Sequence, residues 1–208
     1  MRTRVKFCGL TRLADVDAAV ALGVDAIGLV FHPPSPRGLD VEQAAALVAA
    51  LPAFVTAVGL FVDAEADRVR AVLERVPLGA LQFHGAEPAD YCRGFGRPWI
   101  KSVAVRAGVD LKAEARRYAG ASALLLDTYD PVLAGGTGRR FDWGLVPIQQ
   151  ASRVILAGGL TAANVADAIR QLRPHAVDVS GGIEQSKGIK SPDKMTDFMK
   201  GVGDGDQS

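Results

Sequence analysis

A lone thiol and a lone carboxylate lie at the ends of two apolar runs in this sequence. Cys8 is the last residue of the run 4–8, and Asp127 lies near the end of the run 123–128. A thiolate and a carboxylic acid can exchange protons with a substrate, and neither group is needed to pack a strand. We therefore predict that Cys8 and Asp127 form a catalytic acid–base pair.

Four further polar side chains lie at or near the ends of two other apolar runs. Gln82 and His84 belong to the run 79–84, and Asp178 and Ser180 belong to the run 176–180. They are candidates for substrate binding. For Gln82, His84 and Asp178 a structural role is an equal alternative, because protein interiors also hold polar side chains whose hydrogen bonds are satisfied.

Two glycine pairs follow the last two apolar runs of the chain, Gly158-Gly159 and Gly181-Gly182. Glycine lets backbone amides approach an anion closely and adopt positive φ. A helix that starts beneath such a turn adds a favourable field. One pair would be weak evidence, but two pairs at successive turns predict a phosphate-binding site.

Two loops carry further candidates. Arg37 ends the proline-rich segment 32–37, and an arginine held by a stiff turn can bind a carboxylate through two parallel hydrogen bonds. A solvated surface arginine is the alternative. The glycine-rich segment 135–138 lacks the P-loop pattern, so we interpret it as a mobile loop over the substrate, with a plain flexible connection as the alternative.

The elements that must position these groups alternate regularly along the chain. Short β-branched or aliphatic runs predict eight strands, at residues 4–8, 25–31, 55–62, 79–84, 99–105, 123–128, 153–157 and 176–180. Amphipathic patterns between them predict helices at 13–22, 41–51, 65–76, 111–118, 162–172 and 192–202, with weaker ones at 88–93 and 145–151. Three N-caps are expected, at Thr11, Asp40 and Thr161.

Strict alternation requires parallel strands with right-handed crossovers, which leaves an open doubly wound sheet or a closed barrel. Eight units favour a single compact (β/α)8 TIM barrel over residues 1–202, with a disordered tail at 203–208. Alternate strand residues then point inward, and the carboxyl ends of the strands form the mouth where active sites lie. This parity directs a set of polar side chains inward, namely Lys6, Cys8, Gln82, His84, Asp127, Asp178 and Ser180.

Composition excludes several function classes. The 24 basic and 23 acidic residues nearly cancel, which argues against nucleic acid or an anionic membrane as a partner. Neither a membrane-spanning run nor a secretory leader is present, so we expect a cytoplasmic protein. Two cysteines without a CxxC pair and three histidines without ligand spacing predict neither a disulfide framework nor a metal site, and no motif indicates a cofactor.

An ordered set of motifs closely resembles the phosphoribosylanthranilate isomerases of tryptophan biosynthesis, over nearly the whole chain. Any one match would be weak, but the order makes the set specific. The matching segments are Lys6-Phe7-Cys8-Gly9-Leu10-Thr11, Ser35-Pro36-Arg37, Leu81-Gln82-Phe83-His84-Gly85, Leu126-Asp127, Gly135-Gly136-Thr137-Gly138, Phe141-Asp142-Trp143, Leu156-Ala157-Gly158-Gly159-Leu160, Val177-Asp178-Val179-Ser180, Gly182-Ile183-Glu184, Lys187-Gly188-Ile189-Lys190 and Asp193-Lys194.

The resemblance implies an Amadori rearrangement of a phosphorylated aminoaldose, without metal or cofactor. It implies that Cys8 is the general base, Asp127 the general acid and Arg37 the partner of the anthranilate carboxylate. The phosphate would bind backbone amides around both glycine pairs. The family often has a second serine where this chain has Gly181, so a hydroxyl contact is in doubt there, whereas an amide-based site is not.

A basic Cys8 needs help, because a free thiol is only a few per cent thiolate at neutral pH. Lys6, two residues away on the same face, is the expected source of positive charge. Three alternatives stay open: a cysteine hydrolase built on Cys8, His84 and Asp127, another phosphosugar isomerase or epimerase, and a phosphosugar-binding module without catalysis. The sequence leaves monomer or homodimer undecided.

Overall fold

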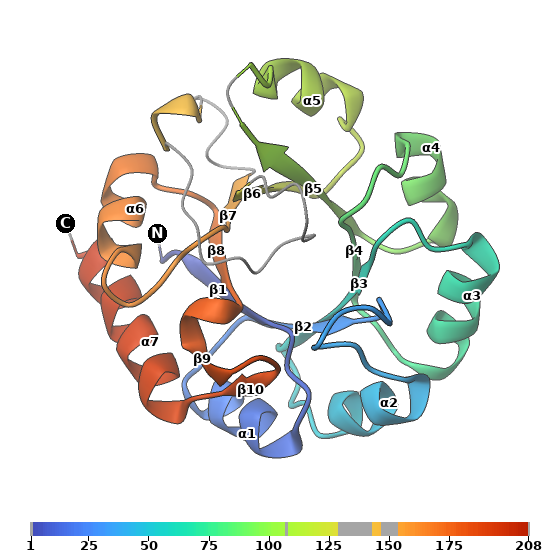
Figure 1. Cartoon of the computed structure of the whole chain (residues 1–208), viewed down its shortest axis with the longest axis horizontal. Helices are drawn as coiled ribbons and strands as arrows, with labels where there is room; N and C mark the ends of the chain where they lie inside the picture. Colours follow the sequence, from blue (N-terminus) through green and yellow to red (C-terminus); the bar gives the residue numbers. More distant parts are fainter. Residues whose placement is uncertain (1, 107, 129–142, 147–153, 208) are drawn as a thin grey trace.

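Eight parallel strands close a barrel in the computed structural model, which describes residues 2–106, 108–128, 143–146 and 154–207. Each strand pairs with the next along the chain, and β1 pairs with β8 to complete the ring. Figure 1 shows the strands as the inner ring and the helices around it. The strands are β1 Arg4–Cys8, β2 Ala26–Val30, β3 Thr56–Phe61, β4 Ala80–Phe83, β5 Trp99–Val105, β6 Ala123–Thr128, β7 Val154–Leu156 and β8 Ala176–Val179. The predicted (β/α)8 fold is confirmed.

The helices in the described part of the chain follow the predicted pattern and cover the outside of the barrel. They are α1 Leu13–Ala21, α2 Val41–Ala49, α3 Ala66–Arg75, α4 Ala89–Cys92, α5 Leu111–Arg117, α6 Val165–Leu172 and α7 Pro192–Asp206. Short 3-10 turns lie at Arg93–Phe95, Trp143–Leu145 and Gly181–Ile183. None of the described helices is both long and apolar enough to cross a membrane. The glycine-rich segment 135–138 and most of the helix expected at 145–151 lie outside the described residues.

The core has two apolar layers, and their composition confirms the predicted parity. Phe7 packs outward, its ring centroid 6.0 Å from that of Phe198 in α7. Phe83 likewise packs outward, against Tyr91 of α4 at 5.6 Å. Residues of the opposite parity, such as Leu125 and Ile155, form a separate cluster inside the barrel. Residues of odd and even position on one strand therefore face different surroundings, which leaves the inward row free to carry the site.

The carboxyl-terminal tail differs from the expectation of disorder, because α7 continues through Asp206. The carboxylate of Asp206 accepts hydrogen bonds from the backbone N and the hydroxyl of Thr3, so the two ends of the chain are joined. Gly205 permits α7 to lie close to α6, since a Cβ at this position would come within 2.9 Å of Cβ of Ile169. Gly205, in the segment predicted to be disordered, is thus a contact position between the two helices.

Two of the three predicted N-caps are wrong. Asp40 caps α2 as expected, in a reciprocal capping box with Gln43. The first helix is preceded instead by Arg12, and the hydroxyl of Thr11 donates to the carbonyl of Gly188 at 2.6 Å. The sixth helix begins after Asn164, three residues later than expected. The Thr11 hydroxyl is thus used in a contact with Gly188, and the backbone N of Thr161 donates to Oδ1 of Asn164 at 2.9 Å.

A small antiparallel hairpin, β9 Glu184–Ser186 and β10 Ile189–Lys190, lies between β8 and α7. This hairpin was not predicted, because two- and three-residue strands are too short to show a period. Thr11 binds its turn at Gly188. The hairpin therefore packs near the amino-terminal loop at the mouth of the barrel.

Candidate active site

Cys8 ends β1 at the mouth of the barrel and is 5% exposed. It forms a small apolar cluster there with Val30 and Leu60. Gly28 of the neighbouring strand β2 makes room for it, since a Cβ at position 28 would lie 2.6 Å from Sγ of Cys8. A glycine in the middle of a strand often marks such a close approach. Gly28 was not among the predicted site residues.

Lys6 lies one inward position below Cys8 and forms a buried ion pair. Its Nζ donates to Oδ1 of Asp178 at 2.8 Å, and both side chains are less than a tenth exposed. Burial alone would lower the pKa of Lys6, but the charges of Asp178 and of a Cys8 thiolate raise it overall. Lys6 therefore keeps its positive charge inside the barrel.

Burial raises the pKa of the Cys8 thiol above its ordinary value. The positive charges of Lys6 and Lys190 act in the opposite direction, while the carboxylate of Asp178 raises the pKa further. The expected help from Lys6 is therefore present but smaller than the effect of burial. In the substrate-free protein the thiol is protonated at neutral pH, and a thiolate formed there would be a strong base.

Asp127 lies on β6, on the same inward face, and is 8% exposed. Its Oδ1 accepts a hydrogen bond from the backbone N of Thr128 at 2.7 Å. Its Oδ2 lies 3.4 Å from Nε2 of His84. The carboxyl group is thus held by its own strand and by the ring of His84, which directly follows β4.

His84 is oriented by neighbours on two strands. Its Nδ1 lies 3.0 Å from Nε2 of Gln82, and its Nε2 lies 3.3 Å from the hydroxyl of Ser102 on β5. With the Gln82 amide donating to Nδ1, the ring proton is on Nε2 and points toward Ser102 and Asp127. Among the described residues, no hydrogen bond joins His84 to Cys8, so the arrangement required by a cysteine hydrolase is not formed.

One cavity of about 490 Å³ brings these groups together at the carboxyl ends of the strands. Its lining contains all seven of the catalytic and substrate-binding residues predicted from the sequence, along with aliphatic side chains and the loop residues His32 and Ser35. The predicted residues in the lining are Cys8, Arg37, Gln82, His84, Asp127, Asp178 and Ser180.

A second recess of about 360 Å³ adjoins the cavity, and Asp127, Asp178 and Ser180 line both. The four glycines predicted to bind phosphate line this recess: Gly158, Gly159, Gly181 and Gly182.

The two glycine pairs are needed for different reasons. Gly158 and Gly159 adopt positive φ, at 76° and 66°, as expected for a tight turn. Gly182 lies in a 3-10 turn instead, where a Cβ would overlap the carbonyl oxygen of Leu160. Gly182 therefore allows close contact between the turns after β7 and β8, and neither glycine of the second pair has positive φ.

Arg37 lies at the cavity but is already bound to a protein carboxylate. Its Nε and one terminal nitrogen donate to the two oxygens of Glu184 at 2.7 and 2.8 Å. Glu184 in turn binds Nζ of the buried Lys190 at 3.0 Å. Glu184 and Lys190 were part of the matching motifs, but no role was inferred for either, because a sequence does not show which side chains meet across loops. Ser102 was missed for the same reason.

In the described part of the chain, no group of three or more His, Cys, Asp or Glu side chains is placed to hold a metal ion. The side chains and turns that line the mouth supply proton donors and acceptors, cations and backbone amides. A closed (β/α)8 barrel with a thiol, a carboxylate and a glycine-lined recess at its mouth has the architecture of an acid–base barrel enzyme.

Comparison with known proteins defines the family. The model for N-(5'-phosphoribosyl)anthranilate (PRA) isomerase matches residues 5–201. The N-(5'-phosphoribosyl)anthranilate isomerase of Nitrosococcus oceani is 54% identical over 202 residues, which cover 97% of this chain and 98% of that protein. A Pseudomonas putida protein of the same name is 57% identical over 200 residues, 96% of this chain and 97% of that protein. The chain belongs to the phosphoribosylanthranilate isomerase family, as its motifs predicted.

Solved structures of phosphoribosylanthranilate isomerases have the same fold as this chain. The phosphoribosylanthranilate isomerase of Thermotoga maritima superposes with a TM-score of 0.88 at 39% identity, over 97% of this chain and 98% of that one. A phosphoribosylanthranilate isomerase in complex with reduced 1-(o-carboxyphenylamino)-1-deoxyribulose 5-phosphate superposes with a TM-score of 0.85 at 37% identity, over the same shares. The barrel described here is therefore the fold of its family.

Proposed function

We propose that this protein converts N-(5'-phosphoribosyl)anthranilate into 1-(2-carboxyphenylamino)-1-deoxyribulose 5-phosphate, with Cys8 as general base and Asp127 as general acid. The observation that carries the proposal is that both residues line one cavity, which adjoins a glycine-lined recess. Membership of the isomerase family supports the choice of reaction.

The reaction is an aldose-to-ketose isomerisation by proton transfer. Asp127 protonates the ring oxygen as the C1'–O bond breaks, and the nitrogen lone pair forms a Schiff base. Cys8 then removes the proton from C2', and the electron pair of that C–H bond forms the C1'–C2' double bond of an enolamine. In the same step the electron pair of the C1'=N double bond returns to nitrogen. Protonation at C1' and loss of the proton from the C2' hydroxyl then yield the ketone. Atoms and electrons balance within the substrate, so the step needs proton donors and acceptors only.

The function is tested by adding freshly made phosphoribosylanthranilate to the purified protein and following the fluorescence of the anthranilate group. We expect conversion to a product of the same mass, confirmed by mass spectrometry. A protein that binds this compound without converting it would support a silent binding module instead. A trapped acyl-enzyme would support a hydrolase, and equal turnover of phosphosugars without the carboxylate would support a broader isomerase or epimerase.

We propose that the recess around the glycines binds the substrate phosphate through backbone amides. Gly159 offers a matched pair of variants, because Asn and Asp have the same shape and both tolerate left-handed backbone. Gly159→Asp should raise KM by about tenfold or more relative to Gly159→Asn, since a carboxylate near the phosphate repels it. Steady-state kinetics at low ionic strength give both values. Equal KM values for the two variants would contradict this placement of the phosphate.

The proposed partner is a phosphorylated sugar, and neither nucleic acid nor a membrane is proposed as a partner. The protein is proposed to act in the cytoplasm, as a monomer or homodimer. One family structure is described as monomers generated from a dimeric phosphoribosylanthranilate isomerase of Thermotoga maritima, so both states exist among relatives. Light scattering of the purified protein decides between them.

A further inference from the structure

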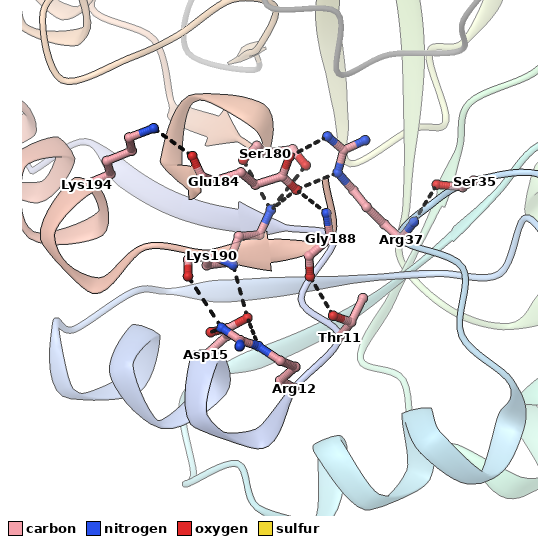
Figure 2. Close-up of polar contacts among 10 residues, drawn as sticks. All are labelled: Thr11, Arg12, Asp15, Ser35, Arg37, Ser180, Glu184, Gly188, Lys190 and Lys194. Carbon is pink, nitrogen blue, oxygen red and sulfur yellow. Dashed lines mark hydrogen bonds and ion pairs between the residues drawn. The ribbon is translucent and has the colours of Figure 1, made fainter. Parts of the chain in front are cut away.

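The β9–β10 hairpin is fixed at the mouth of the barrel by contacts with the first loop and α1, as Figure 2 shows. Thr11 donates to the carbonyl of Gly188 at 2.6 Å. Asp15 accepts from the backbone N of Lys190 at 3.2 Å, and Arg12 donates to the Lys190 carbonyl at 3.4 Å. The hairpin is therefore a rigid support for the side chains that it carries.

Glu184, the first residue of the hairpin, is a buried carboxylate with four hydrogen bonds (Figure 2). Its Oε1 accepts from Nε of Arg37 at 2.7 Å, Nζ of Lys190 at 3.0 Å and the backbone N of Gly188 at 3.2 Å, and its Oε2 accepts from Arg37 at 2.8 Å. Burial would raise the pKa of Glu184, but its bonds to Arg37 and Lys190 lower it below the ordinary value. The side chain is thus ionised and fixed.

Arg37 presents two edges, and Glu184 occupies one of them. A guanidinium can bind one carboxylate along its Nε side and a second across its two terminal nitrogens. The first edge is bound to Glu184, while Nη1 has no partner among the described residues. The stem of Arg37 passes over Gly9, where a Cβ would overlap its Cδ, and its backbone N donates to Ser35 at 3.2 Å. The orientation of the guanidinium is therefore determined at both ends of the side chain.

Charges at this site also favour an anion. Arg37 and Lys190 carry two positive charges, and Glu184 supplies one negative charge, while Lys6 and Asp178 balance each other nearby. The cluster thus has one unbalanced positive charge next to the cavity. A substrate carboxylate would bring it to neutrality, and charge pairs of this kind are strong when little water is present.

We propose that Glu184 is a positioning residue for substrate specificity: by binding the Nε edge of Arg37, it directs the terminal nitrogens toward the carboxylate of the substrate's aromatic ring. This inference rests on the proposed function, in which Arg37 binds that carboxylate. Without Glu184 the guanidinium loses its partner and can adopt several rotamers, so the energetic cost of ordering Arg37 falls on substrate binding.

The test compares two competitive inhibitors. One is reduced 1-(o-carboxyphenylamino)-1-deoxyribulose 5-phosphate, and the other is the same compound without the ring carboxylate. The inhibition constant of the compound without the carboxylate is divided by that of the compound with it. This ratio isolates the contribution of the carboxylate, because phosphate and sugar contacts are common to both. The ratio is measured in the wild type, in Glu184→Gln and in Glu87→Gln. Glu87 is a matched control, since it is a buried carboxylate paired with Lys101 at 3.1 Å and has no contact with Arg37.

In Glu184→Gln the ratio should fall by about tenfold to a hundredfold, the scale of a hydrogen bond to a charged group. Binding of the compound without the carboxylate should be nearly unchanged, and KM should change more than kcat. Glu87→Gln should keep the wild-type ratio. If Glu184→Gln does not fold, as judged by circular dichroism, Glu184→Asp is measured in the same way, since its shorter side chain cannot keep both bonds to Arg37.

An unchanged ratio in a folded Glu184 variant would overturn the inference, and so would an equal loss of affinity for both inhibitors, which indicates a purely structural role. Failure of the proposed function is seen separately, in the wild type. A wild-type protein that does not convert phosphoribosylanthranilate contradicts that function, whereas normal wild-type turnover with an unchanged variant ratio contradicts only the role of Glu184.

Discussion

Replacing Cys8 by alanine should lower kcat for phosphoribosylanthranilate by roughly 10²- to 10⁴-fold, the usual contribution of a positioned acid or base. The thiol lies at the end of β1 in the same cavity as Asp127, and Gly28 leaves room for it. Alanine removes the one sulfur that the described residues contribute to that cavity lining, and it keeps the strand. Cys8→Ser should lose as much activity, because a hydroxyl of similar size is far harder to deprotonate at neutral pH.

The second cysteine provides the matched control for this variant. Cys92 lies in α4, 1% exposed, and burial raises its pKa to about 11. Cys92→Ala removes an equally buried thiol outside the cavity, so it should leave kcat unchanged even if stability falls. Wild-type turnover in Cys8→Ala would contradict its assignment as the base.

The pH dependence gives an independent readout of the same residue. Because burial raises the pKa of Cys8, the thiolate fraction of the free enzyme increases as pH rises above neutrality. The pH dependence of kcat/KM reports the ionisation of groups in the free enzyme. In the wild type, kcat/KM should therefore rise with pH above neutrality as Cys8 loses its proton, which gives an ascending limb in the pH profile. This limb should be absent from the residual activity of Cys8→Ala.

Asp127→Asn should also lower kcat by roughly 10²- to 10⁴-fold. Asparagine keeps the size of the side chain and an oxygen that can accept from the backbone N of Thr128, as Asp127 does at 2.7 Å. It cannot deliver a proton to the ring oxygen of the substrate. The geometry of the site should therefore remain while the acid is lost, and binding of the reduced product analogue should change much less than kcat.

Asp17→Asn in α1 is the control for the second variant, because Asp17 is an exposed aspartate outside the cavity lining. Its kcat should equal that of the wild type. If Asp127→Asn turned over at the wild-type rate while folded, Asp127 would not be the acid, and His84, whose Nε2 lies 3.4 Å from that carboxylate, would be the next group to test.

The positions of the other cavity residues could be predicted from the sequence, but their contacts could not. The inward positions of Gln82, His84 and Asp178 followed from parity, and the cavity contains them all. Their partners did not follow. His84 was considered as a possible base for Cys8, yet its ring meets Gln82, Ser102 and Asp127. Arg37 was expected to bind the carboxylate of the substrate, and in the structure it is bound to the carboxylate of Glu184.

The sequence by itself determined the eight strands, the inward row of polar residues and the family, because strand alternation is a local property of period two and the family motifs are contiguous. Only the tertiary structure decided which charges meet. Lys6 and Asp178 lie 172 residues apart, and Arg37 and Glu184 lie 147 apart. Their contacts, and the burial that raises the pKa of Cys8 despite a neighbouring lysine, depend on closure of the barrel, which joins the first strand to the last. Electrostatic effects depend on distance and solvent exposure in space, and neither is encoded in spacing along the chain.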